Sequence, residues 1–336
     1  MIPNHASSFF PCFLLLAPLA AQDAIQLQSP TTGKVAFVQR AKQAQNIDAG
    51  GQQMEANQEL THHYTVEVTK VAEDGKRTFT VTIDRVNGSI DVPMAGTIAF
   101  DSASKETESE GEGDDGAMGG MGMPSGATMT AGLKEIAGKQ FTATVGADGT
   151  IHGTAGFDEA RKAAEKKLGM AGQFLNSAMS ERSLQNLVRG AIGHLPTAAV
   201  APGATWETKI EAGTGITTEQ SLKLTLVKAD ADAAEISYSG SVAKKEGGGR
   251  GPMADATVEN GKVSGVAIIS RKDGFAMSLK STSSMTLLTE NEMVGEMSIE
   301  MKLSTEVMRA DDAAKTEAAK TALPAKSEPA KPATGK

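Results

Sequence analysis

The sequence predicts a mainly β protein of the α+β class: a large curved antiparallel sheet, or half-barrel, of about ten strands, with a central helical segment at roughly residues 157–195 packed on it. Three observations predict this fold. Apolar and polar residues alternate along most of the chain, Asp74-Gly75 and Asp148-Gly149 turns join two pairs of such segments, and helical periodicity interrupts the alternation only once. Strands joined by short turns pair antiparallel and a sheet of this size curls, so we expect the helix on its concave side.

Residues 1–21 have the pattern of a secretory signal peptide. The apolar run from Phe9 to Ala21 contains the only cysteine, Cys12, and is shorter than the roughly 20 apolar residues that span a bilayer. We expect cleavage near Ala21 and export to the periplasm or the cell exterior. The mature chain would then have no membrane span, no disulfide and no thiolate site. The alternative is a disordered apolar N-terminus on a cytosolic protein.

Residues 22–308 are predicted to form a single β-rich domain. Its clearest strand is 296–307, where Met297, Ile299, Met301 and Leu303 alternate with polar residues. The other predicted strands cover 35–38, 64–68, 79–83, 96–100, 141–145, 150–154, 206–210, 222–226, 236–242, 263–269 and 277–287.

The helical periodicity is strongest from Leu184 to Leu195. Apolar residues recur there at i, i+3, i+4, i+7, i+8 and i+11, and Gly193 and Pro196 end the pattern. Asp158–Leu168 has helix-compatible composition as well. His194 lies at the end of this helix, where a cationic side chain suits the helix dipole, so we interpret it as a cap.

Two segments are predicted to be disordered, the loop 102–131 and the tail 309–336. Residues 101–116 hold seven carboxylates and one lysine, and Gly, Met and Ala follow, which cannot bury enough surface to offset the ordering entropy. A cation site on these carboxylates, or a copper site at Met118, Met121 and Met123, is the alternative for the loop. A weak electrostatic tether to an anionic surface is the alternative for the Ala-, Lys- and Pro-rich tail.

No catalytic or metal-binding motif occurs in the chain. We predict no catalytic, cofactor-binding or metal-binding residue, because the zinc-protease, serine-hydrolase, phosphate-loop and dinucleotide patterns are all missing. His62 and His63 are adjacent on a strand and point to opposite faces, which opposes chelation of one metal. The formal net charge of −8 and the lack of basic patches with aromatics disfavour nucleic acid.

Several short motifs occur in order along the chain. They are Phe100-Asp101-Ser102, Leu133–Gly138, Phe141–Gly149, Gly153–Asp158, Leu195-Pro196 and Pro202–Trp206. In this order they resemble an uncharacterised family of exported bacterial proteins, a domain of unknown function. The resemblance covers roughly residues 60–300 and implies an exported β-rich domain with no known activity or site residues. The outline is also similar to the half-barrels of periplasmic lipoprotein carriers, a likeness of architecture only.

The hypothesis we draw is a non-enzymatic exported protein that binds a lipid or another apolar small molecule between the curved sheet and the helix. Flexible methionines suit such a lining, although ordinary core packing explains them as well. The alternatives are a cell-envelope structural or protein-interaction module and a hydrolase with a dispersed site. The expected lining residues are Met277, Leu279, Met285, Met297, Ile299, Met301, Leu184, Leu187 and Val188.

Overall fold

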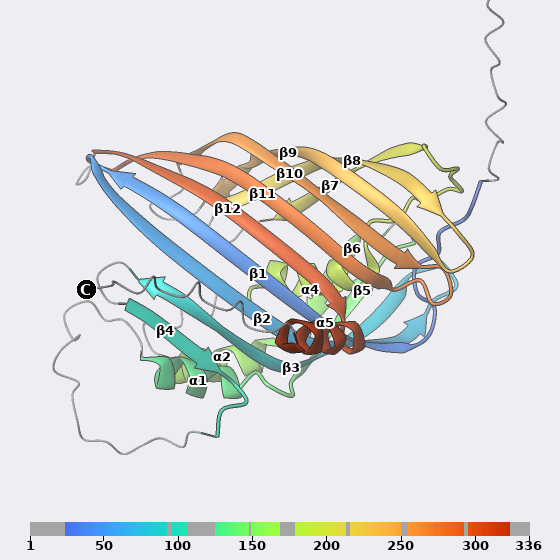
Figure 1. Cartoon of the computed structure of the whole chain (residues 1–336), viewed down its shortest axis with the longest axis horizontal. Helices are drawn as coiled ribbons and strands as arrows, with labels where there is room; N and C mark the ends of the chain where they lie inside the picture. The colour runs from blue at the N-terminus through green and yellow to red at the C-terminus, as the bar shows by residue number, and fades with distance from the viewer. Residues whose placement is uncertain are drawn as a thin grey trace, which may run out of the picture.

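The computed structural model describes residues 24–92, 96–105, 125–147, 149–168, 179–212, 216–249, 255–291 and 295–322. In these residues one antiparallel sheet of twelve strands dominates the molecule (Figure 1). The strands are β1 (Lys34–Ala49), β2 (Gln52–Val71), β3 (Arg77–Val92), β4 (Gly96–Asp101), β5 (Gln140–Val145), β6 (Ile151–Ala155), β7 (Thr205–Ala212), β8 (Ile216–Ala229), β9 (Ala233–Gly249), β10 (Thr257–Ser270), β11 (Ala276–Asn291) and β12 (Gly295–Arg309).

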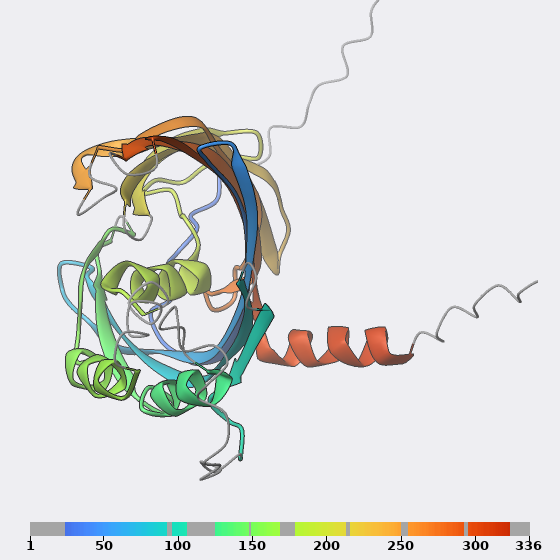
Figure 2. The same cartoon turned by 90° about the vertical axis from the view of Figure 1, so that its left-hand side faces the viewer.

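The first and last strands of the sheet lie side by side in its middle. The spatial order is β6-β5-β3-β2-β1-β12-β11-β10-β9-β8-β7, and β4 pairs with β3. The pairing of β1 with β12 runs without a register shift from Phe37 opposite Arg309 to Ala49 opposite Met297. The sheet curls into an open half-barrel around helix α4 (Glu181–Ile192), as Figure 2 shows. The predicted fold class and the place of the helix on the concave side are confirmed.

Helix α4 begins and ends where its sequence indicates. The Ser180 hydroxyl caps the first turn by accepting a hydrogen bond from the Ser183 N–H at 3.1 Å, and Gly193 ends the helix with a positive φ of 69°. Its apolar stripe is buried against the sheet, with Leu187 only 2 % exposed. The buried Tyr64 hydroxyl of β2 donates to the carbonyl oxygen of Leu187 at 3.1 Å, which fixes the helix on the concave face.

The expected helical segment 157–195 consists of two described helices, α2 (Asp158–Leu168) and α4, and residues 169–178 lie outside the described part. Helix α1 (Gly126–Lys134) corrects the prediction of a disordered loop over 102–131. The reason is a Ser125 cap together with the burial of Met129 and Leu133. Residues 106–124, including the candidate copper ligands Met118, Met121 and Met123, lie outside the described residues.

The predicted disordered tail also begins with structure. Helix α5 (Ala310–Ala322) continues directly from β12 and lies outside the half-barrel (Figure 2). Its Ala313 packs with Val38 and Met308 on the outer face of the sheet. Alanine-rich sequence has high helix propensity, and this contact supplies the tertiary support that a short helix needs.

Candidate functional site

Side chains on the concave face form rows that run across the strands, because paired residues of antiparallel strands point to the same side. The first row lies under α4 and joins His62, Gln39, Val307 and Leu279 through the register of β2, β1, β12 and β11. All four side chains are buried. This part of the concave face is therefore filled core.

The next two rows, one and two pairs farther from α4, are partly polar. They contain Gln43 and Gln58 on β1 and β2, Ser281 and Ser283 on β11, and Thr305 on β12. We call these five residues the polar band. All five side chains are half-buried. Leu303, between Gln43 and Ser283, is 38 % exposed, so solvent reaches this region.

Beyond the polar band the concave face becomes mainly apolar. We call the residues Met54, Ile47, Met285, Met301, Ile299 and Met297 the apolar wall.

The apolar wall is partly exposed although its side chains pack together. Met54 is 40 % exposed, and Met285, Ile299 and Met301 are half-buried against a small cluster that contains Leu287 and Ile216. This arrangement leaves apolar surface accessible at the end of the sheet far from α4.

The two faces of the central strands differ in charge. On the concave side of β1, β2, β11 and β12, between the row of Gln39 and that of Ala49, no side chain is charged. The outer side carries all the charges of these stretches. They are Arg40, Lys42, Asp48, Glu55, Glu59, Lys280, Glu290, Glu296, Glu300, Lys302 and Glu306.

The residues expected to line one pocket separate into three places. Met285, Met297, Ile299 and Met301 come together in the apolar wall. The α4 residues and Leu279 belong to the filled core, with Val188 fully buried. Met301 lies six residues along β12 from the row under α4, a distance of about 20 Å at 3.3 Å per residue. Met285 packs against both the main core and the small cluster, so the two groups adjoin at this residue.

Met277 lies apart from both groups. The register of β10 and β11 shifts where Ile268 pairs with Ser278 and Ile269 pairs with Ala276, so Met277 is the extra residue of a β-bulge. Its side chain is 36 % exposed. Counting alternate residues from Leu279 predicted that Met277 lies on the concave face. The prediction failed to allow for the bulge, because a bulge leaves no clear signal in the sequence.

Two histidines have lowered pKa values, the buried His62 and the half-buried His194. Burial lowers the pKa of His62 to about 4, with the neighbouring His63 as a second cause, and neither ring nitrogen has a partner in the described part. Burial and then Arg189 lower the pKa of His194 to about 4, and its ring meets Tyr238 edge-on at 6.1 Å. The expected cationic cap at His194 is therefore wrong, because the imidazole is uncharged at neutral pH.

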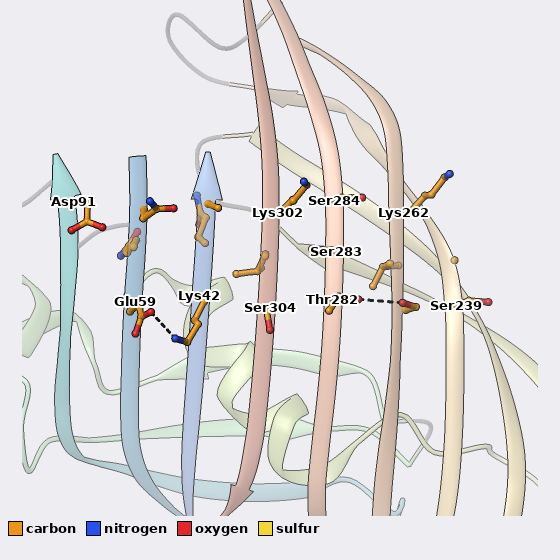
Figure 3. A pocket seen from close by; sticks show the side chains of 18 of the residues that line it. Lys42, Glu59, Asp91, Ser239, Lys262, Thr282, Ser283, Ser284, Lys302 and Ser304 are labelled. Carbon is orange, nitrogen blue, oxygen red and sulfur yellow. Dashed lines mark hydrogen bonds and ion pairs between the residues drawn. The ribbon is translucent and has the colours of Figure 1, made fainter. Parts of the chain in front are cut away.

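A trough lined mainly by Lys, Ser and Thr residues crosses the outer face, opposite the polar band. It has a volume of about 1100 Å³ and spans seven strands from β3 to β9 (Figure 3). Lys42, Lys262 and Lys302 line it, and Lys42 pairs with Glu59 at 2.6 Å. The sequence signal for this trough is the alternation of Ser, Thr and Lys along several strands. It could not be recognised before the register showed that these residues lie side by side.

The described residues contain no group of three His, Cys, Asp or Glu side chains placed to hold a metal ion. Nor is any helix among them both long enough and apolar enough to cross a membrane.

Comparison with known proteins gives a family and several distant structural neighbours. A family model described as a family of unknown function, DUF6263, matches residues 74–276. No curated protein matches the sequence.

Among solved structures, a lipovitellin structure on lipid–protein interactions is 11 % identical with a TM-score of 0.41, over 84 % of this chain and 25 % of that one. A putative outer membrane lipoprotein-sorting protein domain from Vibrio parahaemolyticus is 11 % identical with a TM-score of 0.14, over 82 % of this chain and 83 % of that one. DynF from the dynemicin pathway of Micromonospora chersina is 7 % identical with a TM-score of 0.19, over 87 % and 89 %. The chain thus spans a quarter of the lipovitellin chain, and at these TM-scores the neighbours carry no functional argument.

Proposed function

We propose that this chain, which belongs to the DUF6263 family of unknown function, is an exported, non-enzymatic protein that binds an apolar ligand on the concave face of its sheet. The observation that carries the proposal is the apolar wall. Its methionines and isoleucines lie on the inner side of a curved sheet, are half-buried or exposed, and have no charged neighbour on the same side of the four central strands.

Helix α4 limits where the ligand can lie. Its buried side chains and the Tyr64–Leu187 hydrogen bond occupy the concave face at one end. The ligand therefore contacts the sheet beyond α4, not the helix stripe itself. This placement revises the expectation of a pocket shared by sheet and helix.

The apolar side chains of the concave face offer a modest gain per residue. Fully burying a Leu or Met side chain is worth about 1.5–3 kcal/mol. Leu303 and Met54 are 38 % and 40 % exposed, so completing their burial contributes about 0.6–1.2 kcal/mol each by the same scale. The ligand buries its own apolar surface at the same time. Methionine suits a lining that adapts to ligands of different shape, because its thioether side chain repacks easily.

A protein-interaction module is the second candidate, and the outer trough favours it. The trough is open, crosses seven strands and carries lysine, serine and threonine side chains, which suits an extended partner that accepts hydrogen bonds. A partner there would contact Lys302 and Ser304, whereas an apolar ligand would contact Met301 and Leu303.

Organic extraction of the purified protein, followed by mass spectrometry, tests the proposal. We expect an apolar molecule in stoichiometric amount, or uptake of a neutral fluorescent apolar dye such as Nile red by ligand-free protein. Leu303→Glu places a carboxylate on the concave face and should abolish uptake. Ser304→Glu places the same group on the outer face of the same strand and should leave uptake unchanged. Equal uptake by both variants, or none by the native protein, would contradict the proposal.

A further inference from the structure

We infer that the ligand is an uncharged amphiphile, a lipid whose head group carries hydroxyl or amide groups, with the head group on the polar band and the hydrocarbon along the apolar wall. This inference rests on the proposed function and adds the class of ligand and its direction. Three observations support it: the charge-free concave side, the unpaired polar groups of the band, and the order of the rows.

The concave side offers no counter-ion to a charged head group. Every charged residue of the four central strands over these rows lies on the outer side. Taking a carboxylate or phosphate out of water without a partner costs several kcal/mol. The arginines of α4 are already engaged: Arg189 donates to Asn186 at 3.0 Å, and Arg182 donates to Thr217 at 2.8 Å. An anionic lipid would therefore be penalised on this face, whereas a neutral one would not.

The polar band has free hydrogen-bonding capacity. Among the described residues the side chains of Gln43, Gln58 and Ser283 have no hydrogen-bond partner, although all three are half-buried. An amide side chain offers donors and an acceptor together, and a hydroxyl offers both from one atom. These groups match the hydroxyl or amide of a neutral head group, which also donates and accepts. His62 lies in the first row, under α4, and its neutral ring adds no charge to this side.

The rows also fix the direction of the ligand. The polar band lies nearer to α4, and the apolar wall extends toward the far end of the sheet. From the row of Gln45, where the apolar wall begins, to that of Ala49 is four residues, about 13 Å along the strand. One leaflet of a bilayer core is about 15 Å thick, half of roughly 30 Å, so the wall can contact most of the length of one lipid chain.

Displacement of Nile red from the full-length protein tests the inference with three probes that share an oleoyl chain: monooleoylglycerol, oleate at pH 8, and methyl oleate. We expect monooleoylglycerol to bind about tenfold more tightly than either of the others, a difference of about 1.4 kcal/mol. Oleate binding as tightly as monooleoylglycerol would overturn the inference and leave the proposed function intact. Failure of all three probes, in a protein that also fails to take up the dye, would overturn the proposed function itself.

A variant that introduces a positive charge makes the test independent of the absolute affinity. Gln43→Lys supplies a cation in the polar band and should reverse the preference in favour of oleate. Asn57→Lys supplies the same cation on the outer face of the adjoining strand and should keep the native preference. Circular dichroism checks that both variants fold. Unchanged preference in a folded Gln43→Lys protein would contradict the placement of the head group.

Discussion

Mild acid is expected to destabilise the fold through two histidines whose pKa values are lowered by folding. The pKa of both His62 and His194 falls from 6.5 to about 4 on folding. The unfolded chain binds these protons below pH 6.5, whereas the folded protein does not bind them until about pH 4. Stability from these groups is therefore complete above pH 6.5 and is lost as the pH falls toward 4. The pKa of His63 is also lowered, so it acts in the same direction.

The expected loss of stability follows from the same pKa values. Each histidine contributes a slope that rises toward about 1.4 kcal/mol per pH unit as the unfolded chain becomes protonated and that averages about 1 kcal/mol per unit between pH 6.5 and pH 5, so His62 and His194 together contribute about 2 kcal/mol per unit. Between pH 6.5 and pH 5 the carboxylates add little, because the pKa values of the perturbed ones, such as Asp273 and Asp101, lie below 3.8 in the fold.

Urea unfolding at pH 6.5, 6.0, 5.5 and 5.0, followed by Trp206 fluorescence, measures the slope. His62→Leu removes one titrating group and should reduce the slope by about half. Gln39→Leu changes the equally buried cross-strand neighbour, so it should alter stability but keep the native slope. If His62→Leu and the native protein show equal slopes in this window, His62 is not held neutral beneath α4 and the reasoning is refuted.

Three further predictions concern stability and are measured by urea denaturation at pH 7. Gly265→Ala should cost about 1–3 kcal/mol or more, because its Cβ would lie 2.4 Å from both a neighbouring carbonyl oxygen and the Tyr238 ring, whereas Gly153→Ala, with open space, should be nearly neutral. Equal midpoints for the two would contradict this packing. Leu187→Ala should cost about 2–5 kcal/mol, since the side chain is 2 % exposed, and a loss below 1 kcal/mol would mean that α4 is not packed on the sheet. Ser180→Ala should lower the stability by about 1 kcal/mol through loss of the helix cap, and an unchanged midpoint would show that the cap does not stabilise α4.

Much of the sheet could be predicted because its signals are local. Alternation identified the strand at 296–307, and Asp74-Gly75 identified a hairpin, since both patterns arise within a few residues. The amphipathic stripe from Leu184 likewise predicted α4 and its place on the concave side. The pairing of β1 with β12 could not be predicted, because it joins segments more than 200 residues apart with no turn between them.

The helices α1 and α5 were missed for a different reason. Both occur in sequence of low complexity, where composition favours disorder and tertiary contacts decide the outcome. For α1 the contact is the packing of Gly132 against Leu168, where an added Cβ would lie 2.4 Å from the leucine. For α5 it is the contact of Ala313 with Met308.

Four of the residues expected to line a pocket lie together on the concave face. Met285, Met297, Ile299 and Met301 were chosen by parity, and the register places them together. The residues of the polar band were overlooked because Ser, Thr and Gln on one strand give no signal until the strands are aligned. Met277 was misplaced because a bulge inverts the parity of the residues before it.

Photo-cross-linking tests the central claim most directly. A monooleoylglycerol analogue with a diazirine in its acyl chain is bound to the purified protein, irradiated and mapped by mass spectrometry. We predict cross-links on β12 at Met301 and Leu303, on the concave side, and none at Lys302 or Ser304. Cross-links confined to Lys302 and Ser304 would place the ligand in the outer trough and contradict the account.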